Sequence, residues 1–203
     1  MTRTSLAFAT ALLPLFAAQG AFAAPKYYFQ LQPVKAGPEI DAATKSFAGD
    51  ALNAELASRP EWASEVGAPG RQAPGQDRSD LVAELKKRSL RGFDVTARIE
   101  NLKQQVKDPK PGARNKQLAV EVQLTVFGTT IPDAKLAFSG DGQSATEAEV
   151  SERRLAADTA EATHDVIKDA IKQAVDQAVL KLSLGKSEPM NEKRKKKAKS
   201  ETK

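Results

Sequence analysis

The composition of this 203-residue chain excludes several chemistries before any motif is considered. The chain has no cysteine, which rules out disulfides, thiol catalysis, thiolate-bound metals and lipid attachment to a cysteine. Its net charge of +5 is unevenly distributed, because residues 181–203 carry nine Lys or Arg against three Glu, whereas residues 24–180 sum to −2. The basic character therefore belongs to the C-terminal segment and not to the predicted folded domain.

The first 23 residues have the three-part pattern of a cleavable secretory signal peptide. A short region with Arg3 precedes an apolar run over 6–18, and Ala21 and Ala23 place small residues at the −3 and −1 positions of a cleavage site. A membrane anchor is the alternative, but this run is shorter than the roughly 20 residues that span a bilayer. We therefore expect cleavage after Ala23. The mature chain would be periplasmic or secreted, soluble and not lipidated through cysteine.

The segment after the signal predicts a strand. Tyr27, Phe29 and Leu31 alternate with Tyr and Gln over residues 27–32, which is the period of a strand with one buried face. Pro33 ends it, because proline lacks the N–H that a sheet ladder needs.

Two helices are predicted next. Apolar residues at helical spacing favour the first helix over about 38–58, and residues 61–66 are interpreted as one further helical turn. Residues 67–78 are rich in Gly and Pro and are predicted to be a loop. The second helix begins at residue 79 or 80, and Gly92 suits the left-handed position just beyond its end.

A strand meander and a long helix complete the predicted domain. Alternating apolar residues indicate strands over 93–100 and 118–126 and the start of a fourth strand at 136–138, with a turn at 140–142. The longest helix covers 152–184. The predicted order is therefore β-α-α-β-β-β-α, an α+β fold with one sheet and helices packed on one face. We assign it to residues 24–185, and the Lys-rich segment 186–203 to a disordered tail.

This order resembles the N-terminal domain of the periplasmic TolB family and the CsgG-like and LPP20-like envelope modules. In the last helix, Arg153 and Arg154 followed by Thr163, His164 and Asp165 are similar to the Arg…Ala-His-x-x-Asp pattern of the TolB domain. The resemblance covers roughly residues 27–183. It implies a bacterial cell-envelope module that acts by binding or assembly.

Candidate catalytic and metal-binding motifs have simpler interpretations. Glu161 and His164 have the Glu-x-x-His spacing of di-iron bundles, but His164 is the only histidine, so the second motif that such a site needs is missing. We interpret it as a packed or half-exposed structural residue. The segment Gly185-Lys186-Ser187 is not a phosphate-binding loop, because position 180 is Leu where the motif needs Gly.

Acidic residues near the predicted last helix also favour a structural interpretation. We expect residues 140–142 to be a turn and not a calcium loop, and Glu147, Glu149 and Glu152 to be a solvated approach to the helix. No serine-hydrolase or zinc-protease motif is present, and one Trp, two Tyr and eight Phe are few for a carbohydrate cleft. We predict a protein that is not an enzyme and needs no cofactor.

The C-terminal segment has one clear physical capability. Six basic residues in seven positions would attract polyanions in a salt-sensitive, sequence-blind way. They are Lys193, Arg194, Lys195, Lys196, Lys197 and Lys199. A tail that only solvates the chain is the alternative.

Three functions therefore stay open. The first is a non-enzymatic envelope binding or assembly module whose partner is another envelope protein. The second is a polyanion-binding protein that uses the tail on anionic lipid, lipopolysaccharide or nucleic acid. The third is a hydrolase with an unrecognised site.

Overall fold

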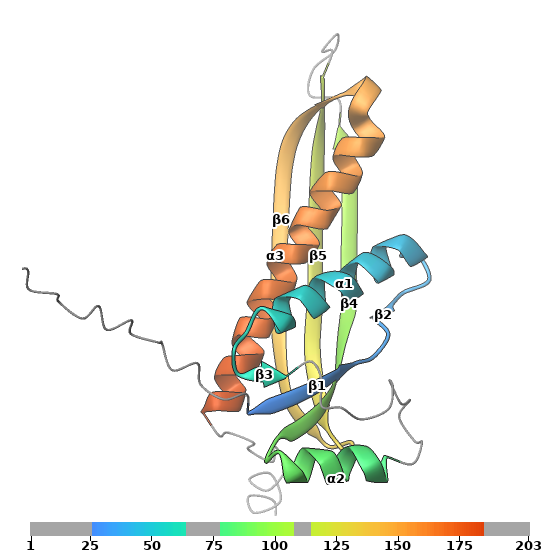
Figure 1. The fold of residues 1–203 in the computed structure, drawn as a ribbon. Coiled ribbons are helices and arrows are strands. Elements are labelled where there is room, and N and C mark those ends of the chain that lie inside the picture. Colours follow the sequence, from blue (N-terminus) through green and yellow to red (C-terminus); the bar gives the residue numbers. More distant parts are fainter. Residues whose placement is uncertain (1–25, 64–77, 108–114, 185–203) are drawn as a thin grey trace, which may run out of the picture.

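The computed structural model describes residues 26–63, 78–107 and 115–184. The predicted signal peptide, most of the predicted loop and the Lys-rich segment with its six candidate residues lie outside these ranges. The elements in chain order are β1 (Tyr27–Leu31), β2 (Lys35–Ala36), α1 (Ala42–Ala57), β3 (Trp62–Ala63), α2 (Ser79–Lys87), β4 (Arg91–Lys107), β5 (Asn115–Thr130), β6 (Leu136–Ser151), the 3-10 helix η1 (Glu152–Arg154) and α3 (Leu155–Ser183). The predicted α+β class and the order of the main elements are confirmed (Figure 1).

One sheet joins all the described strands, in the order β3-β1-β4-β5-β6, with β2 also paired to β4. β1 runs parallel to β3 and β4, whereas β4, β5 and β6 form an antiparallel meander. The meander strands have 16 or 17 residues each, so they extend well past β1 and β2. The sheet therefore has a wide half that contains β1 and a narrow half made of three long strands only (Figure 1).

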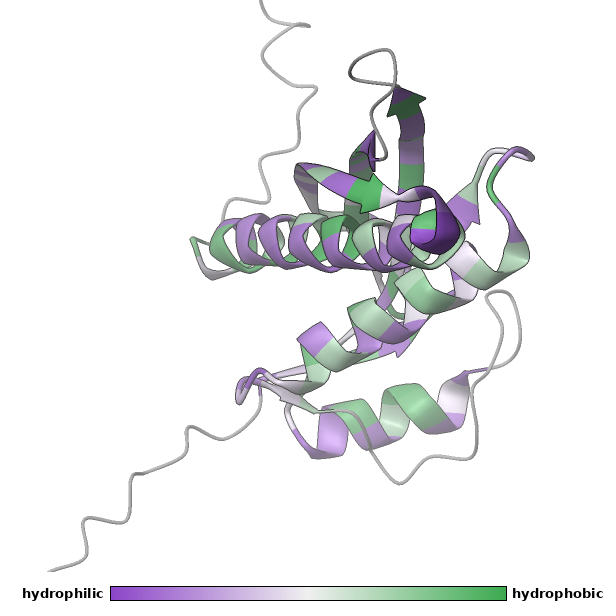
Figure 2. Ribbon diagram, turned by 90° about the horizontal axis from the view of Figure 1, so that it is seen from above, coloured by the Kyte–Doolittle hydropathy of each residue, from purple (hydrophilic) through white to green (hydrophobic). Residues whose placement is uncertain are grey.

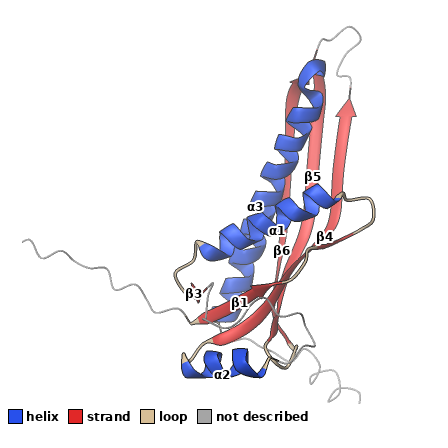
Figure 3. Cartoon of the chain, turned by 45° about the vertical axis from the view of Figure 1, so that its right-hand side comes forward, coloured by secondary structure: helices blue, strands red, loops and turns tan. Residues whose placement is uncertain are grey.

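Helices α1 and α3 cover one face of this sheet. Figure 3 shows α3 running along the long strands and α1 crossing it. Hydrophobic and hydrophilic bands alternate along α3, as expected of an amphipathic helix (Figure 2). The short helix α2 differs from the prediction of helices on one face. Tyr28 packs with α2 while its neighbours Tyr27 and Phe29 pack in the main core, so α2 lies against the other face.

The predicted turn at residues 140–142 is wrong, because Gly140 and Gly142 lie inside β6. A Cβ atom at Gly140 would collide with the carbonyl oxygen of Ala174, and one at Gly142 with that of Ala170. The glycines therefore serve close packing between the strand and α3, and not a change of chain direction.

A bulge in β4 explains why the alternating pattern predicted a strand that ends at residue 100, whereas β4 continues to Lys107. β4 pairs with β5 at Ile99 and again at Asn101, and the register shifts by one residue between them. Before the bulge, the side chains of odd-numbered residues face the main core. After it, those of even-numbered residues do, so Leu102 packs against the core. The alternation expected from one continuous strand is broken at this point.

Two predicted helix boundaries are also corrected. Residues Trp62 and Ala63 form a strand beside β1 and not a helical turn, and the Trp62 ring lies 4.6 Å from the ring of Phe29. α2 ends at Lys87, and Ser89 adopts the left-handed conformation at φ 56° that was expected of Gly92. Gly92 lies in β4, where a Cβ atom would meet the Leu85 side chain.

The three acidic residues before α3 do not form a helical approach. Glu147 and Glu149 belong to β6, and Glu152 begins η1. β6 continues this far because it pairs with β5 up to Asn115 and Ser151. No helix of the described ranges is long and apolar enough to cross a membrane.

Candidate binding groove

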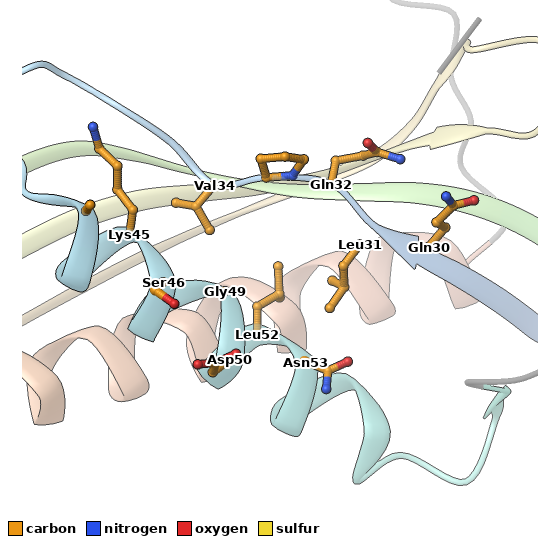
Figure 4. Close-up of a pocket in the computed structure, with 12 residues that line it drawn as sticks. Gln30, Leu31, Gln32, Val34, Lys45, Ser46, Gly49, Asp50, Leu52 and Asn53 are labelled. Carbon is orange, nitrogen blue, oxygen red and sulfur yellow. The ribbon is translucent and has the colours of Figure 1, made fainter. Parts of the chain in front are cut away.

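A groove of about 680 Å³ separates α1 from the chain that leaves β1 (Figure 4). Helix α1 begins at its N-cap Asp41, whose carboxylate accepts a hydrogen bond of 2.7 Å from the backbone N–H of Thr44. The other wall is the segment from Gln30 to Val34, in which Pro33 ends the strand. The wall and the helix come from neighbouring parts of the sequence, with β2 between them.

The groove has an apolar floor and a polar rim. Leu31 and Val34 from one wall and the buried Leu52 from α1 form the floor. The rim is formed by polar side chains of α1, namely Lys45, Ser46, Asp50 and Asn53, which Figure 4 shows around the opening. Lys45 and Asp50 make no ion pair with a described residue, so both charges are available to a ligand. An apolar floor with a few polar groups is typical of a binding site.

Gly49 keeps the groove open at its centre. It lies in the middle of α1, where glycine is a poor helix former. A Cβ atom at this position would lie 3.6 Å from Cγ2 of Val34, which is an ordinary contact distance. A small side chain would therefore fit, whereas a large one would occupy the space between the two walls.

The groove also presents a strand edge. The N–H of Gln32 donates to the carbonyl of Val95 on β4 at 2.8 Å, so the even-numbered residues of this parallel ladder face β4. The N–H and C=O of Leu31 consequently point away from β4. On that side β3 pairs with Tyr27 and Tyr28, and no described strand reaches as far as Leu31.

A buried ion pair holds the β1 wall in place from the other face of the sheet. Asp94 accepts hydrogen bonds from Nη1 of Arg78 at 2.7 Å and from Nε2 of Gln32 at 2.8 Å. Arg78 and Asp94 are both almost fully buried. Nothing in the sequence pattern signalled this pair, because Asp94 occupies an ordinary outward position of a predicted strand.

A second ion pair fixes α1 against α3. Nη2 of Arg59 lies 2.6 Å from both Oε1 of Glu55 and Oδ1 of Asp176. Burial disfavours the charged form of Arg59, but the hydrogen bonds to Asp176 and Glu55 outweigh it and raise the pKa of Arg59 above its usual value. The two walls of the groove are thus each anchored to the rest of the fold.

His164 lies outside the groove and packs against the opposite side of α1. Its ring stacks on that of Phe47, with a centroid distance of 3.7 Å and an angle of 10°. This half-exposed position agrees with the predicted packing role. Among the described residues, no group of three or more His, Cys, Asp or Glu is placed to hold a metal ion.

A smaller hollow of about 340 Å³ lies on the outer face of the sheet and extends to the β6 edge, where Gln173 and Gln177 of α3 also line it. There, Oγ1 of Thr125 is 3.1 Å from Oε1 of Glu100 and 3.0 Å from Oδ1 of Asp141. All three side chains are in contact with solvent, and the apolar floor of the groove has no counterpart here. The groove beside α1 is therefore the stronger candidate.

No family model and no curated protein matches this chain. Several solved structures of bacterial proteins have a similar arrangement of strands and helices. A homolog of the neuraminyllactose-binding hemagglutinin from Helicobacter pylori is 12% identical, with 87% of this chain and 90% of that chain covered and a TM-score of 0.44. A minor lipoprotein from Acinetobacter baumannii is 8% identical, with coverage of 80% and 94% and a TM-score of 0.41.

The C-terminal domain of LpoB from Salmonella enterica is 10% identical, with 60% of this chain and 84% of that chain covered and a TM-score of 0.31. At these values we take no function from the likeness. None of the three is a TolB or CsgG protein, and the resemblance to those families stays a prediction.

Proposed function

We propose that this protein is an exported, non-catalytic binding module of the bacterial cell envelope that captures an extended segment of a partner protein. The groove between β1 and α1 supports this proposal, because it combines an apolar floor with the outward-facing backbone groups of Leu31. The signal-peptide pattern of residues 1–23 supports export.

Strand addition would use both features of the groove. A partner segment beside β1 gains backbone hydrogen bonds from the N–H and C=O of Leu31, and these bonds do not depend on its sequence. An apolar partner side chain reaching Leu52 adds the specificity, while Lys45 and Asp50 contact polar or charged neighbours. Chain capture needs no acid, base or metal, and it is therefore compatible with the described groove.

Filling the groove tests this proposal. A random heptapeptide library displayed on phage is selected against the mature chain, residues 24–203, and the tightest peptide is synthesised. Gly49→Leu places a large side chain between the walls and should weaken binding of that peptide at least tenfold. Gly49→Ala, which makes an ordinary contact with Val34, should leave binding within about twofold. Equal binding to Gly49→Leu and the unmodified chain would refute the groove as the site.

The Lys-rich segment carries a second candidate function, polyanion binding. Its six basic residues, Lys193, Arg194, Lys195, Lys196, Lys197 and Lys199, favour a phosphate- or sulfate-bearing partner. Removal of residues 186–203 should abolish retention on heparin and on vesicles that contain anionic lipid. Unchanged retention would reject this function and leave the groove proposal untouched.

A further inference from the structure

In the wide half of the sheet, the outer sides of both β4 and β6 are covered. On the β6 edge, side chains of α3 spaced four residues apart bind alternate backbone groups of the strand. Oε1 of Gln177 accepts from the N–H of Asp141 at 3.2 Å, Oε1 of Gln173 accepts from that of Gln143 at 3.5 Å, and Nζ of Lys181 donates to the carbonyl of Ser139 at 2.7 Å. On the β4 edge, β1 and β2 pair with the strand as far as Ile99. In this half, neither β4 nor β6 can therefore pair with a further strand on its outer side.

The same two edges are uncovered in the narrow half. Beyond Gln143, no described side chain of α3 hydrogen-bonds to the backbone of β6, and no described strand pairs with β4 beyond Ile99 on its outer side. The two open stretches, 102–107 and 145–151, lie at the same level, because Gln105 pairs with Ala119 and Ala119 pairs with Glu147. Unpaired edges at one level are positioned to meet each other in adjacent molecules.

The charges on the two open edges are opposite. Lys103 and Lys107 lie on the exposed outer face of β4 and form no ion pair with a described residue. Glu147 and Glu149 lie on the same face of β6, also exposed. Like charges across a strand pair are destabilising, so β4 does not favour a second β4, and β6 does not favour a second β6. An unlike pair, β4 beside β6, brings Lys next to Glu.

We propose that copies of this chain associate head to tail, with the open edge of β4 in one molecule beside the open edge of β6 in the next. β4 and β6 both run antiparallel to β5, so they are parallel to each other, and adjacent copies in one orientation continue the sheet with a parallel pair. Val106, which is 45% exposed on the helix-covered side of β4, would lie at this interface between copies. Such a heterologous contact builds a closed ring or an open filament.

Charge reversal tests the pairing. Lys103→Glu with Lys107→Glu makes both edges acidic, and Glu147→Lys with Glu149→Lys makes both basic. We expect each variant to associate at least tenfold more weakly than the unmodified mature chain in sedimentation velocity experiments. An equimolar mixture of the two variants, and the chain with all four substitutions, should associate again, because each restores unlike edges. An unmodified chain that stays monomeric at about 100 μM would overturn the proposal, as would variants that associate normally.

Cysteine pairing then identifies the edges in contact. The chain contains no cysteine, so introduced thiols have no native competitor. Val106→Cys and Ala148→Cys lie at one level, since both positions pair with Leu118 of β5, and in one molecule they are two strands apart, roughly 9.6 Å, which is too far for a disulfide within the chain. Mild oxidation of the double variant should therefore give a ladder of covalent oligomers on non-reducing gels. Dimers formed as efficiently by either single variant would overturn the head-to-tail arrangement.

Discussion

Two glycines of β6 determine how closely α3 approaches the sheet. Gly140 and Gly142 face the carbonyl oxygens of Ala174 and Ala170, and these alanines are themselves fully buried. Small residues on both surfaces bring backbone close to backbone, so there is no flexible side chain that can move aside. The contact therefore depends on the absence of a single methyl group.

Gly142→Ala should consequently lower the free energy of unfolding by about 3 kcal/mol, the upper range for overpacking in a core. Urea denaturation followed by circular dichroism measures this change. The control Ala145→Gly, on the exposed side of the same strand, should cost no more than about 1 kcal/mol. A loss at Gly142 no larger than that of the control would contradict the close contact.

Gly49 should behave in the opposite way. Its added methyl group meets only Cγ2 of Val34 at van der Waals distance, and alanine has the higher helix propensity. We expect Gly49→Ala to raise the free energy of unfolding by about 0.5–1 kcal/mol. A destabilised variant in the same urea assay would show that the walls of the groove lie closer together than described.

At the scale of elements, the beginning of α1 depends on one carboxylate. The backbone N–H of Thr44, together with its hydroxyl, hydrogen-bonds the Asp41 carboxylate and lowers the pKa of Asp41 below its ordinary value of 3.8. The charged form is therefore favoured in the folded state. Its contribution to stability is complete above the unfolded-state pKa and is lost as the pH falls through the lowered folded-state pKa.

Asp41→Asn keeps a capping oxygen without the titration. The melting temperature of the unmodified chain should therefore fall more steeply than that of the Asp41→Asn variant between pH 4 and pH 2.5. Thermal melts at half-unit pH intervals compare the two slopes. Parallel curves over this range would show that the Asp41 carboxylate does not favour its charged form on folding.

The α3 side chains that cover the edge of β6 make a separate prediction. Replacement of Gln173 and Gln177 by Ala removes the acceptors of two backbone N–H groups. Amide hydrogen exchange at Asp141 and Gln143 should accelerate. Exchange at Gly142 should not change, because the N–H of Gly142 points toward β5 and away from the edge. Unchanged exchange at the two outward amides would show that Gln173 and Gln177 do not protect this edge.

Local periodicity made the main elements of this fold predictable. The alternation of Phe93, Val95 and Ala97, and the helical spacing along α3, depend only on neighbouring residues. The bulge near Glu100 was not predictable in this way, because the inward side changes at that residue. Gly140 and Gly142 were predicted to form a turn because their contact partners, Ala174 and Ala170 in α3, lie some thirty residues later in the chain and leave no local pattern.

The groove itself could not be predicted from the sequence. Its lining residues come from a predicted strand and a predicted helix, but no pattern shows how far apart the two are held. That distance depends on contacts such as Arg78 with Asp94 and Arg59 with Asp176, which join residues 16 and 117 positions apart. Sequence reasoning instead singled out His164 and the basic segment. His164 packs on Phe47, and the basic segment lies outside the described residues.

At the scale of the whole molecule, the two proposed contact surfaces occupy different halves of the sheet. The groove lies beside β1 in the wide half, whereas the open edges of β4 and β6 lie in the narrow half (Figure 1). Association of copies would therefore leave every groove open. An assembly of this kind presents several grooves at once and would raise the apparent affinity for a partner with repeated segments.

Amide hydrogen exchange at Leu31 tests the central claim most directly. With the selected heptapeptide bound to the mature chain, the account predicts slower exchange at Leu31, because an added strand accepts its N–H. Gln32 should change little, since its N–H already donates to Val95. Tight peptide binding without protection at Leu31 would contradict strand addition at the groove.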